Sequence, residues 1–366
     1  MCLHLLHVGV NKDMLATSLK STINVMIVND SSYMLEIISD MLLSEQHIVI
    51  TSKARDGLEA LRKLKSQRPD VILLDLEMPN MDGLTFIQEV VKESIIPIIV
   101  VSNYSQLGAK LILDSLELGA LDFISIPQED PEFLRKFKNS LISKIEIAAK
   151  SNPLVAIPDK ISKLKPNVEK KFSVESVASK VVVVGASTGA PKVITDILTA
   201  LPSNLPAGVL VVQHMPKDFT TNFAQRLNDV SKLEVREAKE GDVIKNGLVL
   251  LAPGDYHMTV GPDKRIKLNQ SPKRFGVRPS ANVTMVSASE VFGANVVGVL
   301  LSGMGQDGAF GMKMIKKRQG ITLAQDEATS VVFGMAKAAN ELNAVDKLIP
   351  MDSLATEIEK ELEKIV

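Results

Sequence analysis

Hydrophobic and polar residues alternate in two different patterns over residues 23–149. Short runs of consecutive apolar residues are typical of strands buried on both faces, and the longer stretches between them repeat apolar residues at helical spacing. The expected strands are Ile23–Asn29, His47–Thr51, Val71–Leu74, Ile95–Val101 and Asp122–Ser125, and the expected helices include Tyr33–Leu43, Gly57–Leu64 and Leu134–Ala149. This alternation predicts a doubly wound, five-stranded parallel sheet, whose ligands bind at the carboxyl ends of the strands.

The periodicity stops between Lys150 and Lys180, where prolines and charged residues interrupt the apolar pattern. That composition is typical of a flexible spacer. An anchored linker is the alternative, since Leu154 and other apolar residues within it are able to pack on a domain surface. We therefore expect an extension without assigned function at 1–22, a first domain at 23–147, a linker at 148–178, a second domain at 179–350 and a C-terminal helix at 351–366.

Strands and helices alternate again after the linker. Buried strands are expected at Val181–Gly185, Gly208–Gln213, Asn295–Leu301 and Ile321–Ala324, and helices at Lys192–Leu201, Phe219–Leu227, Val283–Val291, Ala309–Lys317 and Ser353–Val366. Short strands at Leu248–Ala252, His257–Val260 and Arg265–Leu268 are expected to be antiparallel, because turn residues separate them. The second domain is therefore predicted to be a parallel-sheet, Rossmann-like α/β domain.

The first strand of this second domain runs into Gly185-Ala-Ser187-Thr-Gly189, and Pro191 suits the first turn of the helix that follows. A serine at such a strand-to-helix turn stands above the sheet edge, beside helix amides that are able to hold an oxyanion. Two alternatives stay open on this pattern alone. One is a tight turn of small residues without chemistry, and the other is a loop that binds a nucleotide phosphate.

Ser187, His214 and Asp307 follow three different buried strands. In a parallel sheet all three lie along one carboxyl edge, and there they suit nucleophilic acyl transfer: His214 takes the serine proton and Asp307 orients the imidazole. Taken singly, His214 is more often a structural residue and Asp307 more often a turn former. The order Ser, His, Asp disfavours the α/β-hydrolase fold, and the second strand lacks the terminal acidic residue of a dinucleotide-binding unit.

Polar residues also end three strands of the first domain, at Asn29-Asp30, Asp75 and Ser102. Carboxylates that converge on one sheet edge suit Mg²⁺, which binds a few protein oxygens and keeps several waters. The alternative is that each residue merely caps a helix or forms a turn. Three such residues at the same edge favour the metal site.

The composition narrows the classes of function. Of the 366 residues 45% are hydrophobic and 23% charged, as in a globular protein, and the formal net charge of −1 gives no electrostatic footprint for nucleic acid. The single cysteine, Cys2, excludes an internal disulfide framework and favours the reducing cytoplasm. No apolar run reaches the length of a membrane span, and the first eight residues make a poor signal peptide.

Over about residues 22–145 the chain resembles a two-component response-regulator receiver. The resemblance is carried by Val-Asn29-Asp30-Ser, Val-Ile-Leu-Leu-Asp75-Leu-Glu-Met78-Pro79-Asn-Met-Asp82-Gly83 and Val-Ser102. It implies that Asp75 accepts a phosphoryl group from a chemotaxis histidine kinase, that Asp30 and Asp75 hold Mg²⁺ and that Ser102 senses the phosphate. Asn29 replaces one carboxylate of the family's acidic pair, and Ile126 replaces the lysine that contacts the phosphate. Because isoleucine supplies no cation, we expect a partly degenerate receiver.

Over about residues 178–350 the chain resembles the chemotaxis protein-glutamate methylesterases, the CheB family. The motifs are Gly185-Ala-Ser-Thr-Gly189, Gln213-His-Met-Pro216, Ala252-Pro-Gly-Asp-Tyr-His257, Arg278-Pro-Ser280 and Leu301-Ser-Gly-Met-Gly-Gln-Asp307-Gly-Ala. The resemblance implies a Ser187 nucleophile, a His214 base and an orienting Asp307, with the Met304 amide as oxyanion donor and Thr188 and His257 lining the pocket. It also implies that an unphosphorylated receiver covers the active site.

The expected reaction is hydrolysis of glutamyl methyl esters on the cytoplasmic helices of methyl-accepting chemotaxis receptors, with glutamine deamidation as a related activity. It needs no cofactor for catalysis, and Mg²⁺ serves only the receiver. Constitutive activity, or control through a bound protein, is an open variant. The rival from another class is a non-catalytic regulator whose second domain binds a nucleotide or a partner. Ser187, His214 and Asp307 together argue against that rival, because a binding module does not need all three.

Overall fold

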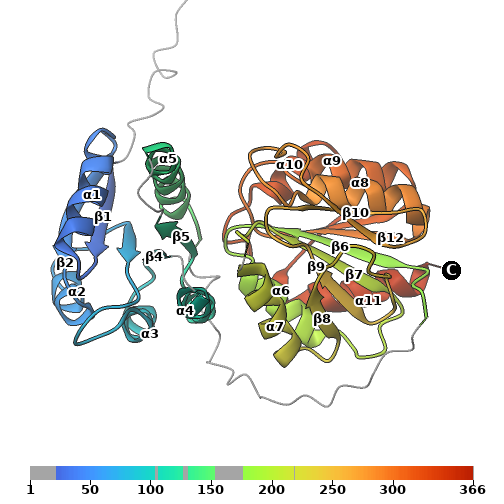
Figure 1. Ribbon diagram of the computed structural model, residues 1–366, viewed down its shortest axis with the longest axis horizontal. Coiled ribbons are helices and arrows are strands. Elements are labelled where there is room, and N and C mark those ends of the chain that lie inside the picture. Colours follow the sequence, from blue (N-terminus) through green and yellow to red (C-terminus); the bar gives the residue numbers. More distant parts are fainter. Residues whose placement is uncertain (1–21, 104–105, 127–130, 153–175, 218, 366) are drawn as a thin grey trace, which may run out of the picture.

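The computed structural model describes residues 22–103, 106–126, 131–152, 176–217 and 219–365. In this part of the chain two α/β units lie side by side (Figure 1). Residues 1–21 of the predicted extension at 1–22 and most of the predicted linker at 148–178 lie outside the described residues. No helix among the described residues is long and apolar enough to cross a membrane.

The first unit is a parallel sheet with strand order β2-β1-β3-β4-β5, which confirms the doubly wound, five-stranded fold predicted from the sequence. Its strands are β1 (Ile23–Val28), β2 (Ile48–Ala54), β3 (Val71–Leu74), β4 (Ile98–Asn103) and β5 (Asp122–Ile126). Its helices are α1 (Ser32–Leu43), α2 (Gly57–Leu64), α3 (Gly83–Glu93), α4 (Gln106–Glu117) and α5 (Pro131–Ala148). Ser31, Asp56 and Asp82 cap three of these helices through their side-chain oxygens.

The second unit is a seven-stranded parallel sheet with order β14-β13-β12-β6-β7-β9-β8. The strands are β6 (Val181–Ala186), β7 (Gly208–Gln213), β8 (Glu234–Glu237), β9 (Leu248–Leu251), β12 (Val296–Leu300), β13 (Ile321–Gln325) and β14 (Lys347–Ile349). The helices are α6 (Pro191–Ala200), α7 (Phe219–Val230), α8 (Ala281–Phe292), α9 (Ala309–Lys317), α10 (Met335–Glu341) and α11 (Leu354–Lys364). The predicted Rossmann-like fold is thereby confirmed.

One strand assignment was wrong. The segment expected to begin an antiparallel set, Leu248–Ala252, supplies β9, which is parallel to both β7 and β8 inside the main sheet. All four residues of β9 are buried, as in a strand covered on both faces. Only β10 (His257–Val260) and β11 (Ile266–Asn269) form the antiparallel pair. The partner strand β8 escaped prediction because three of its four residues are charged.

Helices cover both faces of the second sheet (Figure 1). Buried side chains of α6, α7 and α11 pack on one face, and those of α8, α9 and α10 on the other. Pro191 begins α6 directly after the turn that carries Ser187, as its missing N–H allows. All six residues of β6 are buried, so the strand is fixed from both sides and holds the turn at its end in place.

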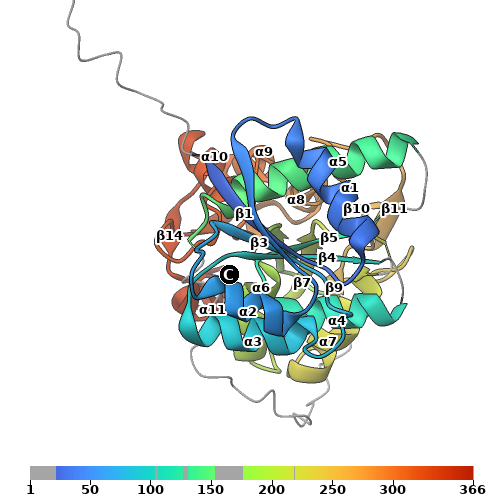
Figure 2. The same cartoon turned by 90° about the vertical axis from the view of Figure 1, so that its left-hand side faces the viewer.

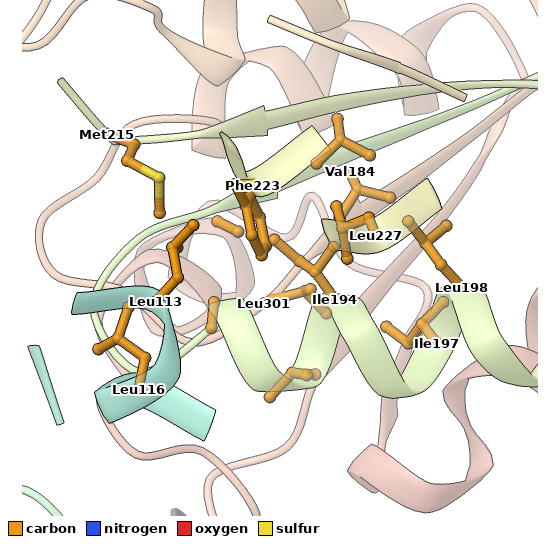
Figure 3. Packing of buried hydrophobic residues seen from close by; sticks show 14 of the residues in the cluster. Leu113, Leu116, Val184, Ile194, Ile197, Leu198, Met215, Phe223, Leu227 and Leu301 are labelled. Carbon is orange, nitrogen blue, oxygen red and sulfur yellow. The ribbon is translucent and has the colours of Figure 1, made fainter. Parts of the chain in front are cut away.

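The first unit packs against the second through α4, β5 and α5. Leu113 and Leu116 of α4 belong to the same buried apolar cluster as Ile194 of α6 and Leu227 of α7 (Figure 3). Arg226 of α7 forms ion pairs with Asp114 and Glu117 of α4. When the molecule is viewed from the first unit, its sheet lies directly in front of the second (Figure 2).

Candidate active site

The three strands that precede Ser187, His214 and Asp307 are neighbours in the second sheet. β6 pairs with β7 on one side and with β12 on the other, and all three run in the same direction. Ser187 follows β6, His214 follows β7, and Asp307 lies in the glycine-rich loop between β12 and α9. The carboxyl edge of the sheet therefore brings the three predicted residues together.

His214 and Asp307 are joined by a hydrogen bond of 2.8 Å between Nε2 and Oδ2. Because Nε2 faces the carboxylate, Nδ1 is the imidazole nitrogen left to take a proton from a nucleophile. Among the described residues the Ser187 hydroxyl has no hydrogen bond to His214. Such nucleophile–base contacts are often long without a bound substrate, so the arrangement remains compatible with proton transfer.

Asp307 is held from the opposite side by the N-terminus of α8. The Ser280 hydroxyl donates to its Oδ1 at 2.7 Å, the Ala281 N–H donates to Oδ2 at 2.7 Å, and the Asn282 N–H donates to Oδ1 at 3.2 Å. Burial alone raises the pKa of the Asp307 carboxyl, but the bonds from His214, Ser280 and Ala281 outweigh it and hold the pKa below its usual value. Asp307 is thus fixed and ionised, as an orienting carboxylate must be.

The glycine-rich loop approaches the Ser187 turn closely. A Cβ on Gly303 would lie 2.8 Å from the Ser187 Cβ and 2.4 Å from the Met335 sulfur, so only glycine fits here. The Ser187 N–H donates to the Ser302 carbonyl at 3.0 Å. The next amide along the loop, that of Met304, has no acceptor in the described part of the chain. It is therefore an available donor close to the nucleophile.

The two residues expected to line the pocket lie in different settings. The Thr188 hydroxyl donates a hydrogen bond of 2.6 Å to Asp122 of β5, so this side chain contacts the first unit. His257 is 1% exposed; its Nε2 contacts the Pro272 carbonyl at 3.2 Å, and its Nδ1 is buried without a partner in the described structure. Burial lowers the pKa of the His257 imidazole, which keeps it neutral.

The first unit packs beside His214 and Thr188 at this edge of the sheet. A cavity of about 280 Å³ has His214 and Pro216 on one wall and residues of β5 and α5, among them Phe137 and Lys144, on the other. Phe123 of β5 stacks on Phe219 with ring centroids 4.7 Å apart. Asp122 accepts hydrogen bonds from Thr188 and from Lys144, so a carboxylate of the first unit is bound at the residue next to Ser187.

At the carboxyl edge of the first sheet, Asp75 follows β3 and accepts a hydrogen bond of 3.0 Å from the Asn29 amide. Burial raises the pKa of Asp75 to about 6, and the nearby charges of Asp30 and Glu77 add to the shift. Ser102 is buried at the end of β4. Ile126 is half-buried and packs on the apolar core of this unit.

The pair Asp30 and Asp75 fits Mg²⁺, because the ion usually takes one or two protein carboxylates and completes its shell with water. Burial first, and the charge of Asp30 after it, raise the pKa of Asp75, and a divalent cation would stabilise the ionised carboxylate against both effects. No cluster of three or more His, Cys, Asp or Glu residues that would form a fuller metal site occurs within the described residues.

Ser280 and Asn282 were missed as parts of the site. The motif Arg278-Pro-Ser280 carries part of the family resemblance but gave no prediction of a role for Ser280, and Asn282 lies two residues beyond that motif. Asn282 holds the loop of Asp307 in a second way, since its Oδ1 accepts a hydrogen bond of 2.7 Å from the Gly311 N–H. A serine before a predicted helix is a capping signal, and that signal marks where a helix N-terminus is able to hold an anion.

Comparisons with known proteins agree with this architecture. Residues 182–358 match the CheB methylesterase family, and residues 25–138 match the response regulator receiver domain. The protein-glutamate methylesterase/protein-glutamine glutaminase of Pyrococcus abyssi is 43% identical over 94% of both chains. The protein of the same name from Clostridium acetobutylicum is 43% identical over 92% of this chain and 97% of its own. The Thermotoga maritima CheB methylesterase catalytic domain is 38% identical with a TM-score of 0.49, over 50% of this chain and 99% of its own.

Proposed function

Because the chain belongs to the CheB methylesterase family, we propose that it hydrolyses glutamate methyl esters on methyl-accepting chemotaxis receptors. The observation that carries the proposal is the hydrogen-bonded pair of His214 and Asp307 on the strand ends beside Ser187. We assign the receiver to residues 23–147 and the esterase domain to residues 179–350.

In the proposed reaction the Ser187 hydroxyl attacks the ester carbonyl and gives its proton to Nδ1 of His214. Asp307 stabilises the imidazolium through its bond to Nε2. The Met304 N–H donates to the oxyanion of the tetrahedral intermediate. His214 then returns the proton to the leaving methanol, and a water molecule hydrolyses the acyl-enzyme to a glutamate side chain and free Ser187.

The same route deamidates glutamine, since ammonia replaces methanol as the leaving group. His214 protonates the departing nitrogen in that case. The names of the relatives from Pyrococcus abyssi and Clostridium acetobutylicum combine both activities. We extend this second activity to the present chain.

The receiver is proposed to regulate access. A histidine kinase phosphorylates Asp75, and Asp30 together with Asp75 holds the Mg²⁺ that phosphoryl transfer needs. Ser102 responds to the phosphate, and the contacts of β5 and α5 with the esterase site are then released. Ile126 supplies no cation to the phosphate, so we expect a weaker switch than a lysine at that position would give.

The test is methanol release from methylated receptor membranes by the full-length protein. The wild-type chain is expected to release methanol, and Ser187→Ala is expected to release none, because the variant lacks the nucleophile. The variant should remain folded, because Ser187 is only half-buried and alanine is smaller. The enzyme proposal fails if the wild-type chain forms no more methanol than the Ser187→Ala blank, both when Asp75 is phosphorylated and when it is not. The non-catalytic alternative predicts that result together with intact receptor binding by both proteins.

A further inference from the structure

Residues 271–277 form a short, hydrogen-bonded hairpin with an unusual residue at its turn. The Arg274 and Val277 main chains exchange two hydrogen bonds, of 3.1 and 2.9 Å. The two turn residues, Phe275 and Gly276, have φ of 50° and 79°, a left-handed geometry typical of two-residue hairpins. Such a geometry suits Asn or Gly and disfavours a bulky side chain, yet the sequence has Phe at the tip. A bulky residue in an unfavourable conformation at an exposed turn suggests a functional role for Phe275 and not a stabilising one.

The hairpin is fixed rigidly to the catalytic segment. Arg278 donates to the carbonyls of Gln270 and Ser271 at 2.7 and 3.0 Å and pairs with Asp255 at 2.7 Å. Pro272, at the base of the hairpin, contacts His257 through its carbonyl. Two residues after Arg278, Ser280 donates to Asp307. The base of the hairpin is therefore hydrogen-bonded to the same segment that holds Asp307.

The tip presents two cations and an aromatic ring to solvent. Lys273 and Arg274 are exposed and have no ion-pair partner in the described part of the chain, and Phe275 is 59% exposed. Arg278 first, then Lys273 and Lys217, lower the pKa of Asp255, which shows that their charges act on one small region. This surface is therefore cationic although the whole chain carries a formal net charge of −1.

The receiver leaves this surface open while it contacts residues beside the proposed triad. Its described contacts with the esterase domain reach Thr188, Met304 and the cavity wall at His214, and the hairpin residues keep their exposure with the receiver in place. A partner is thus able to bind the hairpin before the triad becomes accessible.

We propose that the hairpin 271–277 is a docking surface for an acidic segment of the substrate protein, bound through Lys273 and Arg274 with Phe275 as an apolar anchor. The inference rests on the proposed function, because the esterase converts a neutral ester into a carboxylate. A substrate surface with several such glutamyl sites therefore carries negative charge around the ester under attack. Exposed cations at an interface rim act mainly on encounter and on salt dependence, and a rigid aromatic side chain supplies contact area at low entropic cost.

The experiment measures KM and kcat for methanol release from receptor membranes by the full-length protein. For Lys273→Glu combined with Arg274→Glu we expect KM to rise about tenfold, with kcat unchanged and a weaker dependence of KM on salt. Phe275→Asn, which suits the left-handed turn, should raise KM several-fold without loss of thermal stability. Release from a small glutamate γ-methyl ester should be the same for all variants, since it needs no docking.

Lys232→Glu is the matched control, because Lys232 is an exposed lysine at the amino end of β8, on the sheet edge opposite to the triad. An unchanged KM in the charge-reversed hairpin variant, or an equal rise in the Lys232→Glu control, overturns the proposal.

A second measurement separates this inference from the proposed function. Co-sedimentation of Ser187→Ala chains with receptor membranes reports docking without chemistry, and adding the two hairpin substitutions should weaken it about tenfold. If the wild-type chain releases no methanol but this loss of binding is seen, the docking surface stands and the esterase proposal fails. Equal binding with and without the substitutions, or equal binding to receptor-free membranes of the same lipids, overturns the docking surface.

Discussion

Asp75 is a carboxyl group that folding moves into an unfavourable environment. Burial, followed by the charges of Asp30 and Glu77, raises its pKa to about 6, from 3.8 without these effects. The folded receiver therefore binds this proton more tightly than the unfolded chain does. Its stability falls as the pH rises from about 4 to about 6 and stays lower above that window, by about 3 kcal/mol.

Replacing Asp75 by Asn removes the buried charge and keeps the shape of the side chain. In Mg²⁺-free buffer at pH 7.5, Asp75→Asn should increase the free energy of unfolding of the receiver by about 2–3 kcal/mol, measured by native-state hydrogen exchange of the β1 and β3 amides. At pH 4 the gain should nearly vanish, because the wild-type carboxyl is then largely protonated. The exposed Asp40→Asn is the control. An equal gain at both pH values would contradict the account.

At the level of single residues, the sequence predicted the site residues that follow strands and missed those that tertiary packing brings to the site from other segments. Ser187, His214 and Asp75 each follow a buried apolar run, so the periodic pattern alone places them at a sheet edge. The bonds of Ser280 and the Asn282 N–H to Asp307 depend on where the start of α8 docks, and the close fit of Gly303 depends on the Ser187 turn. Such approaches are set by tertiary packing, which local patterns do not encode.

Helices α4 and α7 form a charged contact between the two units. Arg226 of α7 is partly buried, with 21% of its side chain exposed, and faces both Asp114 and Glu117 of α4. Partly buried pairs of this kind are weakly stabilising when intact, but removing one partner leaves the others desolvated without compensation. Next to them, Leu113 and Leu116 supply the apolar part of the contact (Figure 3).

Arg226→Ala should therefore loosen the closed arrangement. Two carboxylates would then face each other without a cation, and basal methanol release by the unphosphorylated chain should increase about tenfold, as a loss of about 1.4 kcal/mol implies. Arg236→Ala serves as the control, since Arg236 pairs with Asp242 inside the second unit. Basal release that is identical in wild type and Arg226→Ala would show that this ion pair does not hold the receiver in place.

Among the elements, long apolar or amphipathic segments were predictable and short polar ones were not. The runs of β6 and β7 admit hardly any other structure, because every residue is apolar or small up to Gln213. β8, with its sequence Glu-Val-Arg-Glu, is a strand only because β9 offers its edge. Its place at the end of the sheet follows from tertiary pairing and not from intrinsic propensity.

At the scale of the whole molecule, the proposed function couples two sites through the contacts that β5 and α5 make beside Ser187 and His214. Phosphorylation of Asp75 gains influence on the esterase only by shifting the balance between the closed arrangement and an open one. With Mg²⁺ and acetyl phosphate, we expect methanol release by the full-length chain to increase several-fold, and Asp75→Asn to be insensitive to the donor. An increase that persists in Asp75→Asn, or none in the wild type, would place regulation elsewhere.

The relative placement of the two units could not be predicted from the periodicity of the sequence, because it depends on side chains such as Arg226 and Asp122, which contact the other unit.

The cavity beside His214 gives the closed arrangement a property that simple blockage lacks. Its volume of about 280 Å³ holds several water molecules or one small organic molecule, whereas an α-helix is about 10 Å across and cannot enter. We therefore expect a compact acylating probe to reach the His214 imidazole in this arrangement while a protein helix does not, so that reactivity toward the probe and activity toward a protein become separate properties.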